Sequence, residues 1–189
     1  MLERFSVGVA YVSPVMFKDK SSALKILKDS IEHSGTLLKY TYAGDQFKTA
    51  SDIAMEVLHP PPQGMPGRDN ASSVVLSIKY ADRRILLTGD LEPPGSQALM
   101  NELPCHCDVL LAPHHGSAYS VPDAMANWST PNWVIIAGRS DDGRVARPVY
   151  EAHGATVLNT ADCGAVTVTI GRGQFTVDCF RPQNVRGKQ

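Results

Sequence analysis

The fold class follows from two stretches of the chain, Arg84-Ile-Leu-Leu-Thr-Gly-Asp90 and Asp108-Val-Leu-Leu-Ala-Pro-His-His-Gly-Ser117. In each, an apolar run typical of a buried strand leads into a side chain that can bind a metal: Asp90 in the first, His114 and His115 in the second. The carboxyl ends of parallel strands meet at one edge of a sheet, where ligands commonly bind. The sequence therefore predicts that these side chains lie close together.

The residue types at this edge suit a metal site. Gly89 and Gly116 allow the backbone to turn sharply beside a ligand. The Asp90 carboxylate and the imidazoles of His114 and His115 are donors suited to Zn²⁺, Mn²⁺ or Fe. A second interpretation stays open, because Gly-Asp after a strand is also typical of a turn or a helix N-cap.

The rest of the chain indicates one mixed α/β domain over residues 1–189, without internal repeats. Helices are expected from Ser21 to Gly35, with Leu24, Leu27 and Ile31 on one face, between Ser96 and Leu103, after Pro122, and over Pro148–His153. A β-hairpin is expected around Ala81-Asp82-Arg83. The remaining strands are expected at 7–12, 37–42, 53–58, 133–137, 156–158, 165–170 and 174–179.

Composition excludes several classes of protein. Hydrophobic residues make up 43% of the 189 residues and charged residues 20%, which is ordinary for a globular domain and argues against disorder. The formal net charge of −1 argues against a protein that holds nucleic acid or anionic lipid by bulk positive charge. Four cysteines are too few for a disulfide scaffold, so free or buried thiols are expected.

The sequence contains neither a secretory signal pattern nor an apolar run long enough to span a membrane. We therefore expect no membrane contact from this chain itself and, by default, a cytoplasmic location.

The block from Asn70 to Ser117 resembles the metallo-β-lactamase-fold domain of the DNA-uptake competence protein ComEC family. The resemblance is carried by the segments at 70–80, 84–92 and 107–117, and more weakly by Val57–Pro61 and Asn159–Val166. It implies an α/β fold of the metallo-β-lactamase-like αββα sandwich type and a metal-dependent hydrolase. DNA or another phosphodiester is the implied substrate, and one or two Zn²⁺ or Mn²⁺ ions would activate a water molecule.

On this resemblance Asp90 is the bridging metal ligand, and His115 is preferred over His114 as the second ligand; Asp90 and His115 are the expected catalytic residues. Ser117 is a candidate substrate contact, with turn capping as the alternative. Arg147 is a candidate phosphate contact, with an ordinary solvated arginine as the alternative.

The sequence also departs from the family. The family's first metal motif, His-x-Asp-x-Asp-His or His-x-His-x-Asp-His, is absent, so the domain is expected to be incomplete at its N-terminus and short of ligands. Where the family has Asn-x-Tyr-Gly-His-Pro, this chain has Ser140 to Pro148, and Arg147 stands nearest the lost histidine.

Two hypotheses follow: part of a metal-dependent hydrolase, or a non-catalytic binding or structural remnant of the fold. An incomplete sheet also predicts an unpaired edge, and hence self-association or association with an upstream membrane part. As part of a full-length protein of this family, the chain would be membrane-associated.

Two further histidines are given structural interpretations. His59, before three prolines, is expected to end a strand rather than to bind a metal. His106 lies between Cys105 and Cys107, but neighbouring residues of an extended chain point to opposite sides and rarely face one ion.

Overall fold

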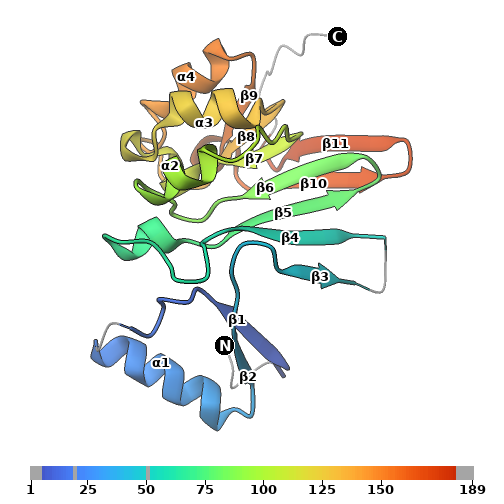
Figure 1. The fold of residues 1–189 in the computed structure, drawn as a ribbon. Helices are drawn as coiled ribbons and strands as arrows, with labels where there is room; N and C mark the ends of the chain where they lie inside the picture. The colour runs from blue at the N-terminus through green and yellow to red at the C-terminus, as the bar shows by residue number, and fades with distance from the viewer. Residues whose placement is uncertain (1–5, 19–20, 50–51, 182–189) are drawn as a thin grey trace.

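The computed structural model describes residues 6–18, 21–49 and 52–181 (Figure 1). Its centre is a seven-stranded sheet in the order β3-β4-β5-β6-β7-β8-β9. Strands β3 to β6 pair antiparallel, and β6 to β9 pair parallel. The strands are β3 (Gln46–Lys48), β4 (Ala54–His59), β5 (Val75–Tyr80), β6 (Arg83–Leu87), β7 (Val109–Leu111), β8 (Trp133–Ile136) and β9 (Thr156–Asn159).

The parallel half of the sheet confirms that the two quoted stretches are adjacent strands. Leu87 at the end of β6 lies opposite Leu111 at the end of β7, and Leu111 lies opposite Ile135 in β8. The loops that follow these strands therefore leave the sheet at the same edge, and they carry Asp90 and the two histidines.

The sheet buries its parallel strands under helices α2 (Gly95–Met100), α3 (Pro122–Ser129) and α4 (Ala146–Ala152), which lie on one side of it (Figure 1). Strand residues and helix residues meet there in one hydrophobic core. The central members, each under 7% exposed, are Leu86, Leu110, Val134, Ile136, Met125, Trp128 and Tyr150. This core holds the strand ends in fixed positions.

Two small sheets flank the large one. At the N-terminal side, β1 (Val9–Val12) and β2 (Leu37–Tyr40) pair in parallel, joined by α1 (Ser22–His33). Near the C-terminus, β10 (Val166–Gly171) and β11 (Gln174–Cys179) form an antiparallel hairpin. Short helical turns η1 (Asp69–Ser72), η2 (Pro113–Gly116), η3 (Ala118–Ser120) and α5 (Thr160–Cys163) complete the described elements.

The mixed α/β class is confirmed, whereas the αββα sandwich stays a prediction. The hairpin turn is shorter than expected: Tyr80 pairs with Arg83, so the loop holds only Ala81 and Asp82, both with positive φ as a type I′ turn requires. Strand β3 and turn α5 were not predicted.

The expected helix is confirmed as α1, but its apolar side chains are buried to different extents. Ile31 is buried, but Leu27 is 39% exposed. The reason is that the sheet beside this helix has only two strands and covers only part of its apolar face. Within the described ranges, no helix is both long enough and apolar enough to span a bilayer.

Candidate metal site at the strand ends

The strand ends are tied together by hydrogen bonds between the two loops. Thr88 donates its hydroxyl to the Leu111 carbonyl at 2.6 Å, and the His114 backbone N–H donates to the Gly89 carbonyl at 3.0 Å. Gly89 has φ +55°, which lets the chain turn directly into Asp90. The predicted convergence of Asp90 with the histidine pair is therefore built by the loop backbones.

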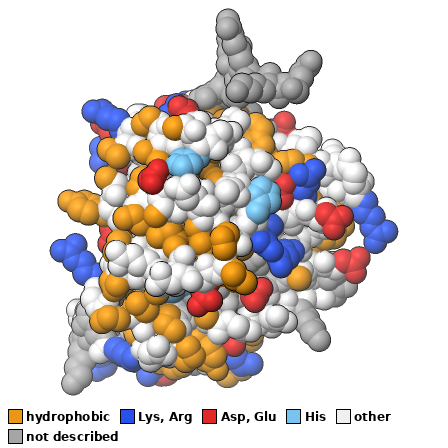
Figure 2. Space-filling model, turned by 45° about the horizontal axis from the view of Figure 1, so that its top comes forward, with side chains coloured by type: hydrophobic (Ala, Val, Ile, Leu, Met, Phe, Trp, Pro, Cys, Tyr) orange, Lys and Arg blue, Asp and Glu red, His pale blue; other side chains and the backbone are white. Residues whose placement is uncertain are grey.

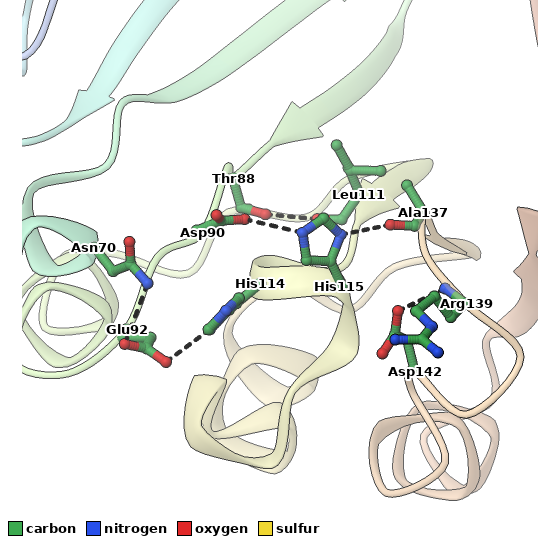
Figure 3. A network of polar contacts seen from close by, with 10 residues as sticks. All are labelled: Asn70, Thr88, Asp90, Glu92, Leu111, His114, His115, Ala137, Arg139 and Asp142. Atoms are coloured by element: carbon green, nitrogen blue, oxygen red, sulfur yellow. Dashed lines mark hydrogen bonds and ion pairs between the residues drawn. The ribbon is translucent and has the colours of Figure 1, made fainter. Parts of the chain in front are cut away.

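Asp90 and His115 point toward each other across the edge of the sheet (Figure 3). The Nε2 atom of His115 lies 3.6 Å from Oδ1 of Asp90, and both side chains are about half exposed. On its other side, the His115 ring contacts the Ala137 carbonyl through Nδ1. A carbonyl only accepts hydrogen bonds, so Nδ1 carries a proton, and in the neutral ring the lone pair of Nε2 faces the carboxylate.

His114 has a different surrounding. Its Nδ1 lies 2.7 Å from Oε1 of Glu92, and Oε2 of Glu92 accepts a 3.4 Å hydrogen bond from the Asn70 side chain (Figure 3). The ring centroids of His114 and His115 are 6.0 Å apart. The two adjacent histidines therefore contact different partners, His114 the Glu92 carboxylate and His115 the Ala137 carbonyl. Sequence reasoning did not single out Glu92; the only signal was its position two residues after Asp90.

The turn that presents the histidines has an uncommon backbone conformation. His114 and His115 have φ angles of 46° and 56°, in the left-handed region, and Gly116 follows at +75°. Each such residue other than glycine costs roughly 1–2 kcal/mol. A side-chain carbon at Gly116 would lie 2.9 Å from the Gly143 Cα. Uncommon conformations of this kind cluster at functional sites, where surrounding contacts maintain them.

Ser117 and Arg147 occupy different positions relative to the site. Ser117 lines a hollow of about 290 Å³ together with both histidines and residues 141–145. Its hydroxyl accepts from the Tyr119 N–H at 3.2 Å, which is the turn-capping contact. Arg147 lies in the first turn of α4 and pairs with Asp162 at 3.2 Å. A contact of either side chain with substrate stays a prediction.

The 139–145 loop beside the site is braced from β9. The side-chain amide of Asn159 donates to the carbonyls of Arg139 at 3.2 Å and Asp142 at 3.0 Å. Asn159 is 2% exposed, so these bonds are shielded from water. Sequence analysis noted Asn159 only within a weak family segment and assigned it no role.

His59 lies at the end of β4, as expected, and is 2% exposed. Its Nδ1 donates to the Ser73 carbonyl at 2.9 Å, and burial lowers the pKa of the ring, partly offset by that bond. His106 contacts Thr130, and Cys107 is fully buried, where burial raises the pKa of its thiol to about 12. These features agree with structural roles for His59 and for the Cys105–Cys107 segment.

Charged side chains of both signs lie around the site, among them Asp141, Asp142 and Arg144 in the wall of the hollow. On the face in Figure 2, lysine and arginine side chains are interspersed with acidic and uncharged ones, as expected for a net charge of −1. Among the described residues, no group of three or more His, Cys, Asp or Glu side chains is placed to hold a metal ion. Asp90 and His115 are thus a pair of donors and lack a third donor in the described part of the chain.

Comparison with known proteins points to competence proteins. No protein-family model matches the chain. The chain is 30% identical over 162 residues to ComE operon protein 3 of Bacillus subtilis, covering 82% of this chain and 20% of that protein. It is 28% identical over 112 residues to competence protein ComA of Neisseria gonorrhoeae, covering 56% of this chain and 16% of that protein. The chain spans about a fifth or less of the length of these relatives, and the similarity supports a relationship to competence proteins.

Proposed function

We propose that this chain carries part of a metal-dependent hydrolase site in a DNA-uptake competence protein, with a metallo-β-lactamase-like αββα fold and a phosphodiester as substrate. Two lines of support converge on it. The segments at 84–92 and 107–117 resemble that family, and the chain is similar to two competence proteins.

The observation that carries the proposal is the orientation of His115. Metal-binding histidines typically donate their second ring N–H to a carbonyl or carboxylate, which fixes the ring and leaves the other nitrogen for the metal. His115 has this arrangement, with Nδ1 on the Ala137 carbonyl and Nε2 facing Asp90. A 3.6 Å separation is too long for a hydrogen bond. It is close to the roughly 3.3 Å between two ligands that each lie about 2.0–2.1 Å from a tetrahedral zinc.

Asp90 and His115 are donors of the types that Zn²⁺ or Mn²⁺ binds, but two donors are too few for a complete site. A catalytic zinc needs about three protein ligands, and the described residues offer two at this place. The proposal therefore requires at least one further ligand in the full protein. A bound ion would supply a water molecule whose pKa is lowered toward neutrality.

The surrounding side chains of this chain have distinct proposed roles. Glu92 holds His114 and keeps its ring turned away from His115, so that a substrate oxygen can approach between them. Ser117 lines the hollow beside His114 and His115, and there it hydrogen-bonds a substrate oxygen. Arg147 contacts a substrate phosphate by exchanging part of its contact with Asp162.

The test is a titration of the full-length protein with Zn²⁺ and Mn²⁺, followed by an assay for cleavage of bis(p-nitrophenyl) phosphate and of single-stranded DNA. We expect metal binding that Asp90→Ala and His115→Ala both weaken. Cleavage is expected once the full-length protein is tested, and it should be lost in the same two variants. Cleavage by full-length protein that survives both substitutions would refute the proposed site.

A non-catalytic binding or structural role is the second candidate, and it is favoured because Asp90 and His115 have no third donor beside them among the described residues. On this alternative, neither the chain nor the full-length protein binds a transition metal stoichiometrically or cleaves a phosphodiester. A metal content near zero in full-length protein purified without chelators would support this alternative.

We also propose that the β1–β2 pair associates with a further protein segment, either an upstream membrane part or a second copy of the chain. Parallel pairing of only two strands is weak, and both strands expose large apolar side chains, with Tyr11 46% and Leu37 53% exposed. Light scattering should show association that Tyr11→Lys weakens. A stable monomer at all concentrations would argue against self-association.

A further inference from the structure

A pocket of about 500 Å³ lies between the turn after β1, at 15–18, and the loop that joins β4 to β5, at 63–72. Two cationic side chains line it, Lys18 and Arg68, and we call it the Lys18–Arg68 pocket. Both residues are exposed, and neither forms an ion pair within the part of the chain that the structure describes. Asp69 is the one acidic residue among those that line the pocket. The lining is therefore net positive, although the chain as a whole carries a formal charge of −1.

The two segments that form this pocket are held against each other. The Lys18 ammonium donates to the Gln63 carbonyl at 3.2 Å, which crosses from one segment to the other. Val15 packs so closely against Gly64 that a side-chain carbon at Gly64 would overlap it, so this approach requires glycine. The cations are thus carried on a fixed frame, which lowers the cost of ordering them when an anion binds.

The pocket is connected to the candidate metal site through the short turn η1. Arg68 directly precedes η1, and the side chain of Asn70 within that turn donates to Glu92 at 3.4 Å. Glu92 in turn lies 2.7 Å from His114. Figure 3 shows Asn70, Glu92 and His114 following one another on one side of the proposed metal ligands. The pocket therefore lies on that same side of the site.

Two arginines on the other side of the site are already paired with carboxylates. Arg144 pairs with Asp141, and Arg147 pairs with Asp162 at 3.2 Å. An incoming anion has to compete with those carboxylates, whereas no carboxylate pairs with Arg68 among the described residues. The Lys18–Arg68 pocket therefore offers positive charge that an anion can use without breaking an ion pair.

We propose that the Lys18–Arg68 pocket binds a backbone phosphate of a nucleic-acid strand, another phosphodiester of which lies at Asp90 and His115. This inference rests on the proposed function, because it adds a second contact for the same substrate. Arg68 supplies a planar guanidinium that matches a phosphate with two parallel hydrogen bonds, and Lys18 supplies a point charge. A positively charged surface beside a site is how proteins follow the backbone of a single strand.

The experiment measures, by fluorescence anisotropy, the binding of a labelled oligothymidylate of about twelve nucleotides to the full-length protein. EDTA is present, so no cleavage occurs and the result does not depend on hydrolysis. Arg68→Gln and Lys18→Gln should each weaken binding about two- to fivefold. Each should also reduce the slope of log Kd against log salt concentration by about 0.7, the value for one phosphate contact of a single strand. Asp69→Asn should tighten binding, which a loss of folding cannot produce.

Arg172→Gln is the matched control. Arg172 is also exposed, but it lies at the tip of the β10–β11 hairpin, outside the pocket. Its substitution should leave both the affinity and the salt slope unchanged. A second control is the substrate bis(p-nitrophenyl) phosphate, which is too small to reach from the strand ends to the pocket. With metal present, Arg68→Gln should raise KM for single-stranded DNA and leave KM for this small substrate unchanged.

Unchanged oligothymidylate affinity and salt slope in Arg68→Gln and Lys18→Gln, or an equal loss in Arg172→Gln, would overturn the proposal. So would Arg68-dependent binding of inorganic phosphate, or of phosphatidylglycerol vesicles, with unchanged binding of the oligonucleotide, because the pocket would then serve a free anion or a membrane. Protein that binds the strand through Arg68 and Lys18 but cleaves no phosphodiester would refute the hydrolase site and support this contact.

Discussion

Asp108 connects the two strands that carry the candidate site, and its removal has a predictable cost. Its carboxylate accepts from the Arg83 guanidinium at 2.7 Å and from the Arg84 backbone N–H at 2.8 Å. Asp108 is 5% exposed, so its carboxylate, the acceptor in both bonds, is largely shielded from water. These contacts join the start of β6 to the start of β7, opposite to the ends that carry Asp90 and His115.

The magnitude for Asp108→Ala follows from these two bonds. The Arg83 side chain is 42% exposed and regains water when the carboxylate is removed, so this bond contributes about 0.5–1 kcal/mol. The Arg84 N–H loses its acceptor near the sheet, which costs about 1–3 kcal/mol. We expect a loss of roughly 1.5–4 kcal/mol in the free energy of unfolding, or about 3–16 °C in Tm for a chain of this length.

The effect should also depend on pH. Burial acts to raise the pKa of Asp108, but the hydrogen bonds from Arg83 and Arg84 outweigh it and hold the pKa below its ordinary value. The unfolded chain therefore takes up this proton at a higher pH than the folded one. The stabilisation is full above the ordinary aspartate pKa of about 3.9 and is lost as the pH falls through the lower folded value.

Urea unfolding at pH 7 and at pH 3 tests this reasoning, with Asp108→Asn as an intermediate variant that keeps an acceptor oxygen. Asp29→Asn makes the same chemical change as Asp108→Asn at an exposed position of α1 and is the matched control. A cost below about 1 kcal/mol for Asp108→Ala at pH 7, or a cost that grows on acidification, would refute the argument.

Three further predictions concern the core, the turn and a buried histidine. Leu110→Ala, at a fully buried position, should cost about 3–4 kcal/mol in urea unfolding, whereas Leu103→Ala at an 87% exposed position should be nearly neutral; equal costs would contradict the assigned core. Gly116→Ala should lower Tm more than Gly154→Ala, because both have positive φ but only Gly116 faces a backbone contact at 2.9 Å; the reverse order would contradict the assigned turn. Since burial lowers the pKa of His59, stability should fall as the pH drops below about 6.5. His59→Gln should reduce this loss, and an unchanged pH profile would contradict it.

The parallel strands and the position of the site could be predicted from sequence because each signal is local. Arg84 to Asp90 and Asp108 to Ser117 each combine an apolar run with a turn, and pairing of the two runs follows from their burial. Short elements at the edges of the fold were harder to predict from the sequence. Strand β3 has only three residues and α5 has four, so neither is long enough to show a periodic pattern of apolar residues.

Contacts between distant segments could not be predicted. Glu92 reaches His114 only because the two loops leave the sheet side by side. Nor does helical periodicity reveal that Leu27 stays exposed, because that depends on how many strands lie beside the helix.

The central claim is that Asp90 and His115 bind one metal ion together. The most direct measurement is calorimetric titration of Zn²⁺ into the wild-type full-length protein and into its Asp90→Ala, His115→Ala and His153→Ala variants. The last is the matched control, since His153 pairs with Asp123 at 2.9 Å away from the strand ends. We predict that each of the first two substitutions weakens Zn²⁺ binding at least about tenfold and that His153→Ala does not. Equal affinity in all four proteins, or a loss confined to His153→Ala, would contradict the claim.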